Sequence, residues 1–84
     1  MNIKSTRILV INTGSTSTKI AIYDNTVCTL LKTLHHSMAD LAPYKTISEQ
    51  FEFRKSVILW ELEHDRVDLA SIDIIINNLK FSTS

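Results

Sequence analysis

The sequence predicts an α/β fold made of a three-stranded antiparallel meander, a helix and a parallel fourth strand. Three observations lead to this expectation. Short strand-like segments with tight connections fill the first part of the chain, a helical pattern occupies the middle, and the apolar run Ile72–Ile76 follows it. Consecutive strands with short connections pair antiparallel, whereas a helix between two strands of one sheet implies a parallel crossover.

The first three strands are predicted from apolar runs and from alternation. Residues 7–12 form an almost continuous apolar run rich in β-branched side chains, typical of a strand covered on both faces. Residues 18–23 alternate and predict a second strand. Asp24 begins a turn pair, and residues 27–34 predict a third strand with weaker alternation.

Two helix starts follow the third strand. Ser37 and Asp40 have the spacing of a capping box, and a proline three residues later is expected to end that short helix. Thr46 and Glu49 repeat the spacing for a second helix, which should run to about Asp65.

The second helix carries one apolar stripe with a single polar member. Arg54 is that member, and its aliphatic stem is expected to lie along the apolar surface. The apolar positions are Ile47, Phe51, Ile58 and Leu62, with Val57 beside them.

Composition excludes several function classes. The 84 residues allow one small domain, and 44% hydrophobic content is ordinary for a globular protein. A net charge of zero predicts neither a nucleic-acid partner nor an anionic membrane surface. Cys28, the only cysteine, rules out an internal disulfide, fits a cytoplasmic location and is interpreted as a small apolar strand residue.

The polar loop between the first two strands best fits a ligand site. Gly14 permits close backbone approach and dihedral angles closed to other residues, so successive N–H groups can form an anion nest. Lys19 adds a positive charge, and Asn12 offers an oxygen to a hydrated metal or an amide to a phosphate. Further hydroxyl donors come from Ser15, Thr16 and Ser17.

This loop is not a Walker-type P-loop. Thr13 and Thr18 stand where the two glycines are needed, Ile20 stands where a Ser or Thr should bind magnesium, and a strand rather than a helix follows. The residues alone therefore leave two interpretations open, a phosphate-binding hairpin loop and a solvated polar hairpin.

The three histidines and the tryptophan are not expected to bind a ligand. His35 and His36 are adjacent and would face opposite sides of a strand, so they cannot share an ion. His64 near the helix C-terminus suits a dipole contact, and all three are expected at the surface. Trp60 is expected to be a core or edge aromatic.

The stretch ILVINTGSTSTKIA, residues 8–21, resembles the opening of the acetate and butyrate kinase family, whose members have the ribonuclease H-like fold of actin-like ATPases. The form of residues 14–19 is closer to butyrate kinases. Further matches follow in order: His36-Ser37, QFEFRK at 50–55, VIL at 57–59, and Leu69, Ile72 and Asp73. The resemblance covers about residues 7–76.

The resemblance implies an enzyme that transfers phosphate between ATP and a short-chain carboxylate such as butyrate. ATP and magnesium would be its cofactors. The resemblance also allows the full-length enzyme to be an oligomer. By matching residues, Asn12 would contact magnesium or phosphate and Lys19 the nucleotide phosphates. Ser15 and Ser17 would be loop donors.

Two departures from the family pattern stand out. Thr13 replaces a typical proline, and Asn78 stands where the family has an arginine that serves the transferring phosphoryl group or the acid. No catalytic residue is then retained. Residues 1–76 are expected to be the N-terminal part of an acetokinase-like domain and residues 77–84 a divergent polar tail. The chain is expected to be a fragment, inactive alone; the alternatives are a non-catalytic phosphate- or nucleotide-binding module and a structural remnant.

Overall fold

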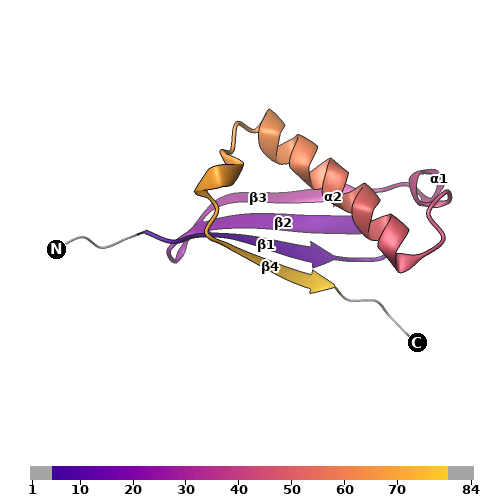
Figure 1. Ribbon diagram of the computed structural model, residues 1–84, viewed down its shortest axis with the longest axis horizontal. Coiled ribbons are helices and arrows are strands. Elements are labelled where there is room, and N and C mark those ends of the chain that lie inside the picture. The colour runs from indigo at the N-terminus through magenta and orange to yellow at the C-terminus, as the bar shows by residue number, and fades with distance from the viewer. Residues whose placement is uncertain (1–4, 80–84) are drawn as a thin grey trace.

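The computed structural model describes residues 5–79, with side chains up to residue 77 (Figure 1). The predicted meander, helix and parallel last strand are confirmed. In chain order the elements are β1 (Arg7–Thr13), β2 (Ser17–Asp24), β3 (Val27–His35), α1 (Met38–Leu41), α2 (Ile47–His64), a short 3₁₀ turn η1 (Leu69–Ser71) and β4 (Ile74–Leu79).

The four strands form one mixed sheet in the order β3-β2-β1-β4. β1 pairs antiparallel with β2, which places Ile11 opposite Ile20, and parallel with β4, which places Ile8 opposite Ile74. This order, with β1 in the interior of the sheet, is consistent with the N-terminal half of an actin-like ATPase.

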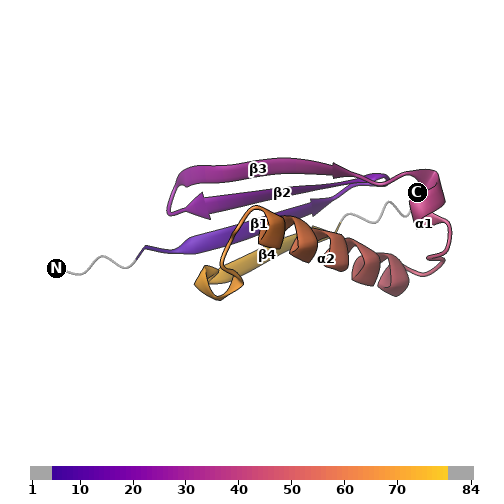
Figure 2. The ribbon, with the colours of Figure 1, turned by 90° about the horizontal axis from the view of Figure 1, so that it is seen from above.

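α2 lies across one face of the sheet, and no described element covers the other face (Figures 1 and 2). Alternate side chains of a strand point to opposite faces, so each strand sends one set of side chains toward α2. The buried core is formed by Leu9, Ile20, Ile22 and Leu34 from the sheet and Ile58 and Leu62 from α2.

The fourth strand begins later and runs further than the sequence predicted. Asp73 precedes it and closes two bonds with Arg7: its backbone N–H donates to the Arg7 carbonyl, and its carboxylate accepts from the Arg7 N–H, both at 2.9 Å. These bonds set the start of the parallel ladder. Residues 77–79, expected in a polar tail, are part of β4, and residues 80–84 lie outside the described residues.

The predicted helix starts are present, with one difference. Ser37 and Asp40 form a complete capping box. Thr46 Oγ1 accepts from the Glu49 N–H at 3.1 Å, but the Glu49 carboxylate accepts from the Thr46 hydroxyl rather than from its backbone. α2 ends at His64, as expected.

Ile47 and Asp24 lie elsewhere than predicted, whereas Cys28 lies in a strand, as expected. Ile47 and Trp60 are 57% and 60% exposed, so neither belongs to the core. Trp60 instead stacks on the imidazole ring of His64, also in α2, with ring centroids 5.0 Å apart. Cys28 is exposed on the edge strand β3. Asp24 ends β2 and forms an ion pair with the Arg7 guanidinium at 2.7 Å, which lowers the pKa of that carboxyl.

Candidate functional site

The loop between β1 and β2 is a tight hairpin. The strands stay paired up to Thr13 and Thr18. The Gly14 N–H then donates to the Ser17 carbonyl at 2.8 Å and closes the turn. Only Ser15 and Thr16 lie between these two residues, so the tip of the loop is short and both are exposed.

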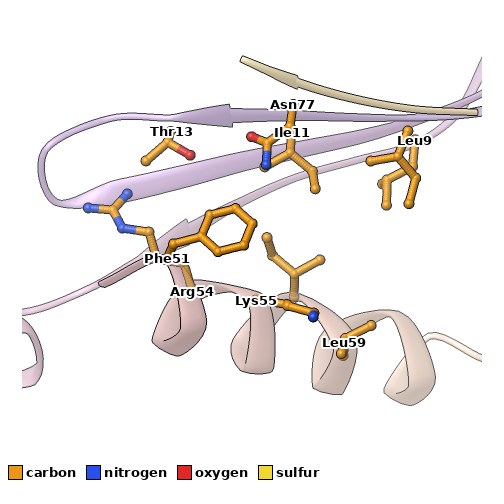
Figure 3. A pocket seen from close by; sticks show the side chains of 10 residues that line it. Leu9, Ile11, Thr13, Phe51, Arg54, Lys55, Leu59 and Asn77 are labelled. Atoms are coloured by element: carbon orange, nitrogen blue, oxygen red, sulfur yellow. The ribbon is translucent and has the colours of Figure 1, made fainter. Parts of the chain in front are cut away.

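Asn12 and Lys19 flank the loop on the sheet face opposite α2. They are direct partners across the β1–β2 ladder, and both are exposed. Leu9, Ile11 and Thr13, which alternate with Asn12 along β1, line the space beneath α2 (Figure 3). Alternation therefore puts Asn12 and Lys19 together on the open face.

Gly14 does not adopt the left-handed conformation that the sequence suggested, because no glycine among the described residues has a positive φ. Its small size matters in a different way. A Cβ built on Gly14 would lie 3.0 Å from the Ser17 hydroxyl oxygen and 3.5 Å from the Ser17 carbonyl oxygen. The glycine thus serves the close approach of the two loop ends rather than an unusual dihedral angle.

Arg54 holds the loop from beneath, a role that the sequence did not reveal. Its side chain reaches from α2 toward the loop end of the sheet and is 5% exposed (Figure 3). Nη1 donates to the carbonyl oxygens of Gly14 at 2.6 Å and Ser17 at 2.8 Å. Nη2 donates to the Ser15 carbonyl at 2.8 Å. The aliphatic stem of Arg54 lines the apolar space beneath α2, as predicted. The sequence did not predict that its guanidinium would bind the loop carbonyls.

His36 is buried beside the same network, contrary to the expected surface position. Its Nε2 lies 2.9 Å from Thr18 Oγ1, which also accepts from Arg54 Nη1 at 3.2 Å. Burial lowers the pKa of His36, and the nearby Arg54 charge lowers it further. A neutral imidazole can accept the Thr18 hydroxyl proton, so the three side chains form one buried polar cluster.

Other charged groups lie away from the loop. Lys32 binds Glu61 at 2.6 Å and Asp65 at 2.9 Å, which ties β3 to the end of α2. Lys19 forms no ion pair within residues 5–79. His35 and His64 are exposed, as expected, and residues 5–79 contain no cluster of three His, Cys, Asp or Glu side chains fit to hold a metal.

A mostly apolar cavity of about 160 Å³ lies between α2 and the β1–β4 edge (Figure 3). Ile58 and Leu59 form its helix wall, and Ile75 and Asn77 of β4 its other wall. β4 extends beyond the cover of α2, since Ile75 is 62% exposed. In the described part of the chain, no helix is long and apolar enough to cross a membrane.

Comparison with known proteins finds butyrate kinases among the similar sequences. The chain is 46% identical over 70 residues to Butyrate kinase 1 and 47% identical over 70 residues to Butyrate kinase 2, both of Clostridium acetobutylicum. It is 47% identical over 64 residues to a Probable butyrate kinase of Bacteroides thetaiotaomicron. These alignments cover 83%, 83% and 76% of this chain, respectively.

The same alignments cover 18–20% of each relative, so the chain spans about a fifth of the length of the curated proteins it matches. No family model matches the chain. The resemblance to butyrate kinases that the sequence motifs indicated is confirmed.

Proposed function

We propose that this chain is the N-terminal part of a butyrate kinase-like phosphotransferase and carries its first phosphate-binding loop. The reaction would transfer phosphate between ATP and a short-chain carboxylate, giving an acyl phosphate and ADP, in the cytoplasm. The observation that carries the proposal is the pairing of Asn12 with Lys19 on the open face of the sheet, next to the exposed loop tip.

The composition of this site suits a polyphosphate. Lys19 is exposed and offers a positive charge to phosphate oxygens, and charge-assisted hydrogen bonds of this kind are stronger than neutral ones. Ser15, Thr16 and Ser17 add hydroxyl donors of small size. Phosphoryl transfer depends mainly on positioning and on charge stabilisation, which such a loop supplies without a nucleophile of its own.

The site also fits a hydrated magnesium ion that accompanies ATP. The Asn12 amide oxygen is a hard neutral ligand, and magnesium in such sites keeps most of its water and takes few protein ligands. Bound magnesium would neutralise phosphate charge.

We propose that the chain alone binds ATP weakly and does not turn over butyrate. A second domain would be needed to close over ATP, exclude water and hold the acid in line. The loop lies at one end of the strands of a single open sheet, so a bound nucleotide would remain exposed to solvent on this chain (Figure 2).

Titration of the 84-residue chain with magnesium ATP, followed by amide chemical shifts, tests the binding. Lys19→Ala should weaken the response on the order of tenfold, because a phosphate charge loses its partner. Lys45→Ala, which removes the same charge from an exposed position outside the loop, is the matched control. Equal affinities for the two variants would contradict the assignment of the loop.

An acyl-hydroxamate assay with butyrate and ATP tests the absence of turnover. Butyrate kinase 1 of C. acetobutylicum serves as the positive control. Product above the blank that co-purifies with this chain would show that the catalytic groups are present here and would overturn the proposed inactivity.

A further inference from the structure

The peptide groups at the loop tip have a defined orientation because Arg54 binds their carbonyl oxygens. The carbonyls of Gly14 and Ser15 both point to the guanidinium, at 2.6 Å and 2.8 Å. A trans peptide is planar, and the N–H of the next residue points opposite to the carbonyl. The N–H groups of Ser15 and Thr16 are therefore directed away from Arg54.

Those two N–H groups have no hydrogen-bond acceptor within residues 5–79. Arg54 approaches the loop from the α2 side of the sheet (Figure 3), so directions away from it lead toward the face of Asn12 and Lys19. Two backbone donors, a lysine and an asparagine amide then face the same region. Successive N–H groups arranged in this way bind anions in other proteins.

The guanidinium also lacks a negative partner. The ion pairs within residues 5–79 join Arg7 to Asp24 and Lys32 to the carboxylates of Glu61 and Asp65 at the end of α2, and none involves Arg54. Its Nε is buried with no hydrogen-bond partner in the same part of the chain. Burial of an unneutralised cation is unfavourable, and a nearby anion on the far side of the loop would lower that free-energy cost.

We propose that Arg54 is the positioning residue of the phosphate-binding loop. It does not contact the ligand directly. It orients the peptide groups between Gly14 and Thr16, so that their N–H groups point toward the phosphate. It also adds positive potential beneath the loop. This proposal rests on the proposed function of the loop and adds a residue from a different element, α2, to its machinery.

Arg54→Lys tests the proposal in the 84-residue chain, because lysine keeps the charge but lacks the planar fork that reaches three carbonyls. Arg66→Lys makes the same change at an exposed arginine and is the control. We expect Arg54→Lys to increase fast amide motion at residues 15 and 16 without ligand, and to weaken magnesium ATP binding on the order of tenfold. Amide shifts elsewhere should report an intact fold.

A rigid loop and an ATP affinity within twofold of the unchanged chain would overturn the proposal. If Arg54→Lys unfolds, a second variant decides: a synthetic chain in which an ester replaces the Ser15–Thr16 amide bond. This change removes the Thr16 N–H and leaves Arg54 in place, so weaker ATP binding supports the proposal and unchanged binding overturns it.

The two proposals fail in different ways. If the unchanged chain shows no response to magnesium ATP, the phosphate assignment is wrong, and the ligand role of Arg54 is wrong with it. The amide motion of residues 15 and 16 in Arg54→Lys then still reports whether Arg54 orders the loop. If the unchanged chain binds ATP and Arg54→Lys binds it equally well, only the positioning role is overturned.

Discussion

The two faces of the sheet differ in what they contribute. The face beneath α2 is tightly buried: Ile20 and Leu62 have no exposed surface. The opposite face exposes apolar side chains, with Leu31 at 66%, Ile74 at 46% and Ile76 at 50%, and it ends in the polar loop residues. One face therefore supplies most of the buried apolar surface, and the other presents the proposed ligand site.

The open face of the sheet also has the composition of a surface that packs against a further layer of structure. β1 and β4 are apolar on both faces, which is the pattern of strands that lie between two layers. A large exposed apolar surface marks an interaction site in most soluble proteins. In the longer relatives, further chain would be available to cover it.

The largest expected effect concerns Asn78, whose backbone pairs with Asn12 at the loop end of β1. We predict that a chimera in which this chain replaces the matching segment of Butyrate kinase 1 turns over slowly. Asn78→Arg should raise its kcat on the order of a thousandfold, by analogy with arginine fingers. The hydroxamate assay measures this.

Thr26→Arg in the same chimera is the control for an added charge, since Thr26 is exposed in the turn at the other end of β2. Equal rates for the Asn78 and Arg forms would show that the arginine assignment, and the alignment of β4 with the family, is wrong.

The second prediction compares the two faces directly. Ile20→Ala should lower the free energy of unfolding by about 4 kcal/mol, because it leaves a cavity in a fully buried site. Ile76→Ala, the same change at a half-exposed strand position, should cost about 1 kcal/mol. Urea denaturation followed by circular dichroism gives both values, and similar losses would contradict the assignment of the core to one face.

The third prediction uses the buried His36. Its pKa lies below the ordinary 6.5 in the folded chain, because of burial and the Arg54 charge, which outweigh the opposing effect of Asp40. The unfolded chain therefore binds more protons below pH 6.5. Stability should be constant just above that pH and should fall as the pH decreases through 6.5 toward the folded pKa.

Urea unfolding at a series of pH values between 5.5 and 7.5 measures this effect. His36→Gln should flatten the profile, whereas His35→Gln, at the exposed neighbouring position, removes only the smallest cause of the lowered His36 pKa and should keep most of the slope. A slope that survives in His36→Gln would assign the pH dependence to another group.

The smallest effect is expected at Gly14. Its φ is not positive, and an added Cβ would meet mainly the Ser17 hydroxyl, which can rotate away. Gly14→Ala should change the free energy of unfolding by less than about 1 kcal/mol. Gly14→Val should weaken ATP binding more, because a larger side chain also crowds the Ser17 carbonyl. A loss of folding in Gly14→Ala would show that the loop is more constrained than its dihedral angles indicate.

The sequence predicted the elements of the fold better than the contacts of its polar residues. Strands and helix follow from local patterns, such as the β-branched run of β1 and the Ser37 and Thr46 caps, so they were visible in sequence. The burial of His36 and Arg54 depends on partners 18 and 36 or more positions away, as their bonds to Thr18 show. No local pattern distinguishes such a buried arginine from one that lies along the surface.

The end of β4 was missed for a related reason. Asn77 and Asn78 are poor strand residues by propensity, and only the ladder with β1 keeps them extended. In contrast, the hairpin that joins β1 to β2 was predicted from the sequence, and the structure pairs Asn12 with Lys19 across it, so that both lie on one face. Whether they bind phosphate is a prediction that the proposed titrations test.

The place of β1 between β2 and β4 has a consequence for the order of folding. β1 meets β2 through a short turn, but it meets β4 only after the chain returns, since Arg7 and Asp73 are 66 positions apart. Contacts between distant residues form slowly because a long loop must close first. During synthesis, the β1–β2–β3 meander can form while the outer edge of β1 still lacks its partner. That edge is then open to a wrong strand, from the same chain or from another, until β4 emerges and occupies it.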